Sequence, residues 1–302
     1  MYEQLAEYWI KCFGEKSKMA KDKTKKTKRP KWRKRLRNGM FLFAAVLIAV
    51  SVGIALPYAG IGSAAAEGES LANQILKRIE SRNRPVIAID PGHGGTDPGS
   101  EGNGIWEYQM TWRVANELKD LLEKDGRFAP VLTISEEESQ NSDVPRVEPV
   151  ERAQRANDAG AVLLVSIHGN SEPSGGARGF ECYAIPPGLE NHDESLRFAR
   201  LAAQEVAAVG QTLRGQDGVR YIYFDTYDNR IVRESSDENQ YDDPTFAILR
   251  TAKCPAVLME QCFLTNQQDT ALMATEAGAK AAAQAYYKAI CEWMESRPDH
   301  AA

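Results

Sequence analysis

Short runs of β-branched and other apolar residues alternate with helical patterns from residue 85 onward, and this alternation constrains the fold more than any other feature of the chain. Between two such runs, Met110, Val114 and Leu118 recur at helical spacing. Strands that alternate with helices are typical of α/β domains with a largely parallel sheet. We therefore expect one α/β domain over residues 85–297. Its expected strands are 86–89, 131–134, 162–167, 179–184, 219–224 and 256–259, and its expected helices are 107–124, 150–159, 192–209, 243–251 and 275–296.

An uncharged run of eighteen residues, 39–56, precedes this domain and is closed by Pro57. As a helix, at about 1.5 Å per residue, a run of this length just crosses a hydrocarbon core of about 30 Å. A buried helix of a soluble domain normally keeps a polar face, and this run has none. We therefore expect one transmembrane helix over 39–57.

The residues before this run are strongly basic. Residues 1–57 contain fourteen of the 37 Lys and Arg residues but four of the 42 acids, which leaves 23 basic and 38 acidic residues in 58–302. A basic stretch alone suggests a nucleic-acid partner, but basic flanks of an apolar run stay in the cytoplasm. We therefore expect 1–38 to be a basic cytoplasmic tail, the domain to be extracytoplasmic, and nucleic acid not to be a partner.

The fate of the apolar segment stays open at this point. It is either a single-pass anchor in the cell membrane or a signal whose cleavage near Ala66 would secrete the domain. The long basic region and the length of the apolar run favour the anchor. Apolar residues at Leu71, Ile75 and Ile79 predict a linker with a short helix over 58–84.

Residues with catalytic chemistry follow three of the expected strands. His93 lies in the glycine-rich loop after the first strand, His168 follows 162–167, and Glu260 follows 256–259. In open α/β sheets, ligands bind beyond the carboxyl ends of the strands. A lone histidine there is more often structural, but two of them with a glutamate favour a functional site.

Glu107 completes this set because it opens a helix fourteen residues after His93, and the loop between them can fold it back toward the strand end. Taken alone, Glu107 also fits a first-turn glutamate that is favoured by the helix dipole. Two histidines and one carboxylate form a catalytic zinc set that leaves a position for water. Glu260, outside that set, is then a carboxylate that takes a proton from the water.

Five motifs in this order resemble the zinc-dependent N-acetylmuramoyl-L-alanine amidase family of bacterial cell-wall hydrolases. They are DPGHGG at 90–95, Glu107, RANDAGA at 155–161, SIHGNS at 166–171 and VLMEQCFLTN at 257–266. The resemblance covers about residues 86–292. It implies a twisted, mostly parallel sheet flanked by helices.

The resemblance also implies roles for individual residues. His93, Glu107 and His168 match the ligands of one zinc ion, and Glu260 matches the catalytic glutamate. The implied substrate is peptidoglycan, cleaved at the amide that joins the muramic acid lactyl group to L-alanine. Asn170 is a candidate for a hydrogen bond to substrate.

The sequence departs from the family pattern at two positions. Cys262 stands where the family usually has glycine, so its side chain is expected to lie near the base or the site. Gly169 stands where the family usually has alanine. Asp90 is by proximity a candidate to accept the second ring N–H of a histidine ligand, but an end-of-strand turn cap is favoured for it.

The disulfide state of the cysteines is left open for Cys182, Cys254, Cys262 and Cys291. One pairing is excluded, because Cys254 and Cys262 bracket a strand and eight steps of about 3.3 Å place them too far apart.

Two other functions remain as alternatives. Related α/β metallopeptidases use similar ligands, so a zinc peptidase acting on cell-wall peptides is one. A non-catalytic wall-binding module is the other, but such a module is expected to lack the ligands or the glutamate.

An acidic segment, 225–243, joins the strand 219–224 to the next helix. It contains seven acids and two arginines and shows no apolar periodicity. A connection of this length is uncommon in a compact domain unless it is functional or disordered. It also resembles an insertion relative to the family pattern. We expect either a solvated loop or a lid or partner-docking segment next to the site.

Overall fold

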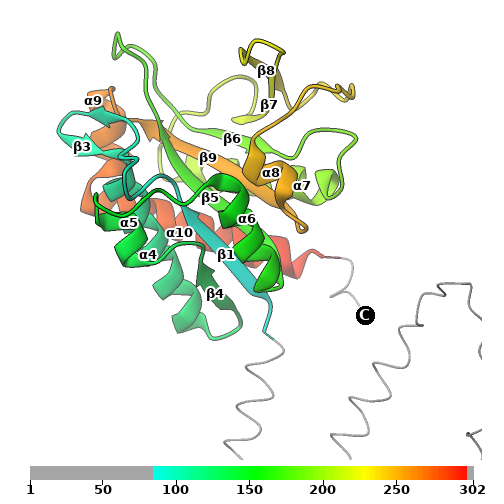
Figure 1. Ribbon diagram of the computed structural model, residues 1–302, viewed down its shortest axis with the longest axis horizontal. Coiled ribbons are helices and arrows are strands. Elements are labelled where there is room, and N and C mark those ends of the chain that lie inside the picture. Colours follow the sequence, from blue (N-terminus) through cyan, green and yellow to red (C-terminus); the bar gives the residue numbers. More distant parts are fainter. Residues whose placement is uncertain (1–83, 298–302) are drawn as a thin grey trace, which may run out of the picture. The chain divides into compact units, whose positions relative to one another are not determined.

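The computed structural model describes residues 84–297, in which seven strands form one mixed sheet (Figure 1). The strand order across the sheet is β4-β1-β5-β9-β6-β7-β8, which places β4 and β8 at opposite edges. The strands are β1 (Val86–Pro91), β4 (Ala129–Leu132), β5 (Ala161–Asn170), β6 (Glu181–Ala184), β7 (Val219–Phe224), β8 (Arg230–Glu234) and β9 (Ala256–Phe263). A separate two-stranded hairpin joins β2 (Glu101–Gly102) to β3 (Ile105–Trp106).

Most neighbouring strands are parallel, as the alternation of strands and helices predicts. The pairs β1–β4, β1–β5, β5–β9 and β6–β7 are parallel, whereas β6–β9 and β7–β8 are antiparallel. The α/β class is therefore confirmed, and the sheet is mixed.

Helices cover both faces of the sheet, but unequally. The longer helices α4 (Glu107–Asp125), α7 (His192–Ala208) and α10 (Glu276–Glu295) pack on one face, where Ile87, Ile89, Val165 and Met259 join their core. The other face has the shorter helices α6 (Pro149–Asp158) and α8 (Ala247–Thr251). The short elements α5 (Glu136–Gln140), α9 (Gln267–Asp269) and the π-helix η2 (Thr270–Ala274) complete the described part of the chain.

The face covered by α6 and α8 is the one that presents polar residues. Successive side chains of a strand point to opposite faces. Ala88, Leu164 and Leu258 pack in the core beneath α6 and α8. Two residues farther along each strand, Asp90, Ser166 and Glu260 therefore lie on that same face, toward the carboxyl ends. The short helices leave this end of the face open.

Two expected strands are longer than the sequence predicts. The apolar runs of β5 and β9 end before His168 and Glu260, but both residues lie inside their strands and pair with each other in register. The side chains of His168 and Glu260 line a cavity, which is why the apolar runs stop before the strands do.

The expected connection at 225–243 is wrong in part. Residues Arg230–Glu234 form β8, which pairs antiparallel with β7 through Phe224↔Arg230 to Arg220↔Glu234. The short helix α5 is also absent from the sequence prediction.

The predicted tail, the predicted membrane segment 39–57 and the linker up to residue 83 lie outside the described residues. Within 84–297, no helix combines the length and apolar character that a membrane span requires. The four cysteines in this range are free: Cys182, Cys254 and Cys262 are buried, and Cys291 is partly exposed.

Candidate active site

His93 reaches the site through the loop that follows β1. Its backbone has a φ of +63°, in the left-handed region. The preceding residue, Gly92, has no side chain, and a Cβ there would lie 2.5 Å from Cε1 of His168. Because only glycine allows this approach, the loop brings the two imidazole rings to a centroid separation of 4.9 Å.

Glu107 is the first residue of α4 and is 3 % exposed. The backbone N–H of Ser100 donates to Oε2 at 2.9 Å, and that of Gly169 donates to Oε1 at 2.9 Å. These two bonds hold the carboxylate against the end of β5. The sequence predicts that the loop after His93 folds Glu107 back toward the strand ends, and the structure agrees with this prediction.

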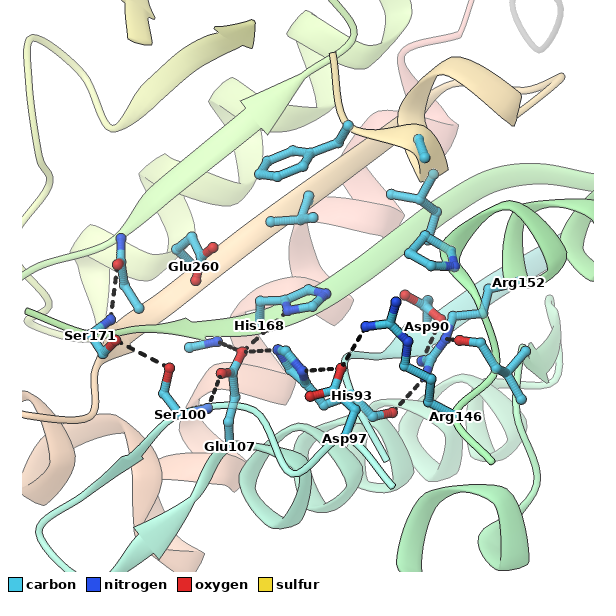
Figure 2. Close-up of a pocket in the computed structure, with 18 of the residues that line it drawn as sticks. Asp90, His93, Asp97, Ser100, Glu107, Arg146, Arg152, His168, Ser171 and Glu260 are labelled. Atoms are coloured by element: carbon cyan, nitrogen blue, oxygen red, sulfur yellow. Dashed lines mark hydrogen bonds and ion pairs between the residues drawn. The ribbon is translucent and has the colours of Figure 1, made fainter. Parts of the chain in front are cut away.

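Three donor side chains converge at this point (Figure 2). Oε1 of Glu107 lies 2.9 Å from Nε2 of His93 and 3.2 Å from Nδ1 of His168. One ligand atom from each of these residues lies within 4.8 Å of the others. Two imidazole nitrogens and one carboxylate oxygen in such a cluster are suited to a divalent metal ion.

The electrostatics of this cluster couple its members. Burial opposes charge on the imidazole, but the hydrogen bond and charge of Glu107, together with Asp97, raise the pKa of His93 to about 9. Burial likewise opposes ionisation of Glu107, but hydrogen bonds from His168 and His93 outweigh it and lower the pKa of this carboxyl. A negative carboxylate at the centre of the cluster is the state that a cation requires.

Asp97 supports His93 from the side away from the cluster. Its Oδ2 lies 3.0 Å from Nδ1 of His93, which orients Nε2 toward Glu107. Metal-binding histidines commonly use such a carboxylate to fix the ring. The sequence interpretation did not include Asp97, although its position four residues after His93 in the same loop is a usable signal.

Asp90 does not cap a turn, so that expectation is wrong. Its buried carboxylate accepts a hydrogen bond from Ser166 Oγ at 2.6 Å and another from Thr133 Oγ1, and it pairs with Arg152 Nη1 at 3.3 Å. Arg152 also donates to the carbonyl oxygen of His93 at 2.6 Å. The pair therefore ties α6 to the His93 loop, a long-range contact for which the sequence offers no signal.

Glu260 faces the same cavity but stands apart from the three-residue cluster (Figure 2). Its Oε2 is buried and has no hydrogen-bond partner among the described residues. Burial and the negative charges of Glu107 and Glu181 raise the pKa of Glu260 to about 8. A carboxyl group in this environment can accept a proton and release it again near neutral pH.

The cavity has a volume of about 650 Å³. The cluster residues, Glu260 and Asn170 all line it. The side-chain Oδ1 of Asn170 accepts from the N–H of Ser171 at 2.9 Å. Figure 2 shows Ser171 joined to Ser100, with 3.1 Å between their hydroxyl oxygens, at the edge of the cavity.

Cys262 does not lie at the site, because β9 has one more residue than β5 where the register shifts between His168 and Asn170. This bulge reverses the direction of the following side chains. Sγ of Cys262 lies 3.8 Å from Sδ of Met110, in the core on the α4 side. The side chain therefore does not crowd Glu260.

Comparison with known proteins agrees with this geometry. The profile of the N-acetylmuramoyl-L-alanine amidase family matches residues 87–292. The endolysin of Bacillus phage SPP1 is 28 % identical over 207 residues, which are 68 % of this chain and 65 % of the endolysin. The amidase LytC of Bacillus subtilis is 27 % identical over 227 residues, 75 % of this chain and 38 % of LytC. The chain thus spans less than two thirds of each of these relatives.

Among solved structures, the catalytic domain of the amidase CwlV from Bacillus (Paenibacillus) polymyxa has a TM-score of 0.54 at 26 % identity. The match covers 70 % of this chain and 99 % of that domain. The family match alone extends over more than half of the sequence. The chain belongs to the N-acetylmuramoyl-L-alanine amidase family.

Proposed function

We propose that this protein is a zinc-dependent amidase that hydrolyses the amide between the lactyl group of N-acetylmuramic acid and L-alanine in peptidoglycan. The observation that supports this best is the convergence of His93, Glu107 and His168 beside Glu260 in one cavity, in a chain of the amidase family.

His93, Glu107 and His168 are the residues that would hold one zinc ion. Their donor set of two imidazoles and one carboxylate fits a catalytic zinc site, and the partly open cavity leaves room for water. When bound, zinc polarises a carbonyl group and lowers the pKa of water toward about 7.

Glu260 is the residue that moves the proton. In its ionised form, Glu260 can accept a proton from the attacking water through its unpartnered Oε2. With a pKa raised to about 8, the resulting acid can pass that proton to the leaving alanine nitrogen. Asn170, at the end of β5 on the cavity wall, is proposed to hydrogen-bond the substrate.

Variants of the site test these roles. His93→Ala and His168→Ala are expected to lose stoichiometric zinc and nearly all hydrolysis of muropeptides. Glu260→Gln is expected to keep zinc and lose turnover, because it removes the proton acceptor and no metal ligand. Zinc content by elemental analysis and peptide release by chromatography are the measurements. A Glu260→Gln protein that retains most of its activity contradicts the assignment.

We also propose that the protein is a single-pass membrane protein with an extracytoplasmic catalytic domain over 85–297, held by residues 39–57 or secreted after cleavage near Ala66. The basic residues before the apolar run support this orientation. A reporter that is active only after export, fused after Ala302, is expected to be active. Activity of a cytoplasm-dependent reporter instead contradicts it.

The regulatory partner expected at 225–243 stays a prediction. Asp228 and Arg230 of this segment line the cavity, and the segment also includes Tyr227, which is 85 % exposed, and Val232, which is 42 % exposed. Exposed apolar side chains of this kind are suited to a protein contact.

A further inference from the structure

Arg230 is a cation on the wall of the cavity, close enough to Glu260 for its charge to lower the pKa of that carboxyl in part. It is the first residue of β8, it is exposed, and its guanidinium makes no hydrogen bond or ion pair among residues 84–297. Two other arginines line the cavity, but each is neutralised. Arg152 pairs with Asp90 at 3.3 Å, and Arg146 binds Glu148 through two bonds of 2.8 and 3.0 Å.

The register of the β7–β8 hairpin directs Arg230 to the catalytic face of the sheet. Arg230 pairs with Phe224, and cross-strand partners point to the same face. Phe224 packs beside the core beneath α6 and α8. Arg233, three residues along β8, points to the opposite face, where its guanidinium stacks over Tyr241 at 5.0 Å from the ring centroid.

The turn before Arg230 is held by its own hydrogen bonds. The carboxylate of Asp225 accepts from the backbone N–H groups of Tyr227 and Asn229 at 2.8 and 2.9 Å, and from Nδ2 of Asn229 at 2.9 Å. Asp228 lines the same cavity but forms no ion pair with Arg230 within the described part of the chain. The guanidinium is therefore presented from an ordered turn and is available to a ligand.

An apolar surface lies beside this cation. The rings of Phe224 and Phe246 form an edge contact with 5.5 Å between centroids, and Leu258 lines the same wall. The cavity thus combines a metal-type cluster, an apolar wall and a free guanidinium. Guanidinium groups recognise carboxylates through two parallel N–H···O bonds.

We propose that Arg230 is a carboxylate subsite, which binds a free carboxylate of the peptide stem while the scissile amide lies at the cluster. This inference rests on the proposed function, because that function brings an N-acetylmuramoyl peptide into the cavity. A peptide stem carries carboxylates, and the apolar wall suits the backbone and small side chains between them and the amide. Arg230 then sets a preference for stems whose carboxylates are not amidated.

The test uses the full-length chain and a matched pair of N-acetylmuramoyl peptides that differ only in free or amidated peptide carboxylates. The unmodified protein is expected to hydrolyse the free form with a kcat/KM about tenfold higher, as expected for hydrogen bonds between charged groups. Arg230→Gln is expected to lower kcat/KM about tenfold more on the free form than on the amidated form, which removes the preference. Loss of the Arg230 charge near Glu260 acts on both forms alike, so the ratio between the two peptides is the readout. Arg230→Lys is expected to keep part of the preference, because its ammonium keeps the positive charge. The preference should be incomplete, because an ammonium lacks the planar fork of a guanidinium.

Arg233→Gln is the matched control, since it removes the same charge from the opposite face of the same strand and should leave the preference unchanged. No preference in the unmodified protein, or equal losses on both peptides in Arg230→Gln, overturns the proposal.

A binding measurement separates this proposal from the proposed function. If neither peptide is hydrolysed, the proposed function is contradicted, and the subsite is judged by titrating both peptides into Glu260→Gln and Glu260→Gln/Arg230→Gln proteins. Tighter binding of the free form that disappears with Arg230 supports the subsite, and equal binding overturns it.

Discussion

At the scale of single residues, the buried pair of Asp90 and Arg152 connects stability with the site. Burial opposes ionisation of Asp90, but Arg152 and the hydroxyls of Ser166 and Thr133 outweigh it and hold the pKa below its ordinary value of 3.8. Because the pKa is lower in the folded state, the ionised carboxylate stabilises the fold above the unfolded pKa. This contribution is lost as the pH falls through the folded pKa.

Asp90→Asn is therefore expected to lower the free energy of unfolding by about 3 kcal/mol at pH 7, since it leaves Arg152 buried without its counter-charge. Below about pH 4, protonation of Asp90 should make the free energies of unfolding of the unmodified and Asp90→Asn proteins more similar. Urea unfolding at several pH values measures it. Asp120→Asn, on an exposed part of α4, is the control, and an equally small effect of both changes would refute the role of the pair.

Gly169 and Cys262, the two departures from the family pattern, both lie next to the side chain of Met110. A Cβ at Gly169 would lie 2.9 Å from Cε of Met110, and Sγ of Cys262 lies 3.8 Å from Sδ of the same residue. Gly169 and Cys262 thus share the volume around Met110.

A double-mutant cycle tests whether residues 169 and 262 are coupled through Met110. Gly169→Ala is expected to destabilise the fold by about 1–2 kcal/mol through overpacking, and Cys262→Gly by about 2 kcal/mol through a cavity. In the double variant the flexible Met110 can move into the vacated space, so the total cost should be about 1 kcal/mol less than the sum. Additive free energies of unfolding would show that the two positions are independent.

At the scale of elements, the sequence predicts what local pattern determines and misses what long-range pairing determines. Helix α4 is predicted to within one residue because its apolar spacing continues to its glycine cap. The strand β8 is missed because RIVRE has no strand alternation of its own and is held by β7. Helix α5 has a readable signal, the capping box of Ser135 and Glu138, which apolar periodicity does not detect.

The same division applies to the candidate site. His93, His168 and Glu260 follow apolar runs, so their convergence can be predicted from strand ends. Asp97 and Arg152 support that site through side-chain contacts that leave no periodic trace. Arg230 requires the register of the hairpin, which only the folded chain provides.

Replacing residues 228–241 with a short Gly/Ser linker distinguishes two proposed roles of the β7–β8 hairpin, a lid over the cavity and a carboxylate subsite. The replacement removes Arg230 and the 3.0 Å ion pair between Arg220 and Glu234. A lid predicts a several-fold rise in hydrolysis of soluble muropeptide and whole wall at unchanged zinc content. A carboxylate subsite predicts a fall of about tenfold on peptides with free carboxylates, and we expect the fall.

At the scale of the whole molecule, the net charge of the domain opposes its localisation at the cell wall. Residues 58–302 contain 38 acids and 23 basic residues. An acidic domain is not held at an anionic wall by its net charge. The proposed anchor at 39–57 would supply that localisation instead, and it would keep the domain close to newly made wall.

The identity of the bond that the protein breaks is the sharpest test of the proposed function. Purified peptidoglycan is digested with the full-length chain and with Glu260→Gln, and the new amino termini and glycan fragments are identified by mass spectrometry. We predict peptides with free amino-terminal L-alanine, intact glycan strands whose lactyl groups end in carboxylates, and no release by Glu260→Gln. A new amino terminus inside the peptide would indicate a zinc peptidase, and binding without any cleavage would indicate a wall-binding module. Either result contradicts the proposed function.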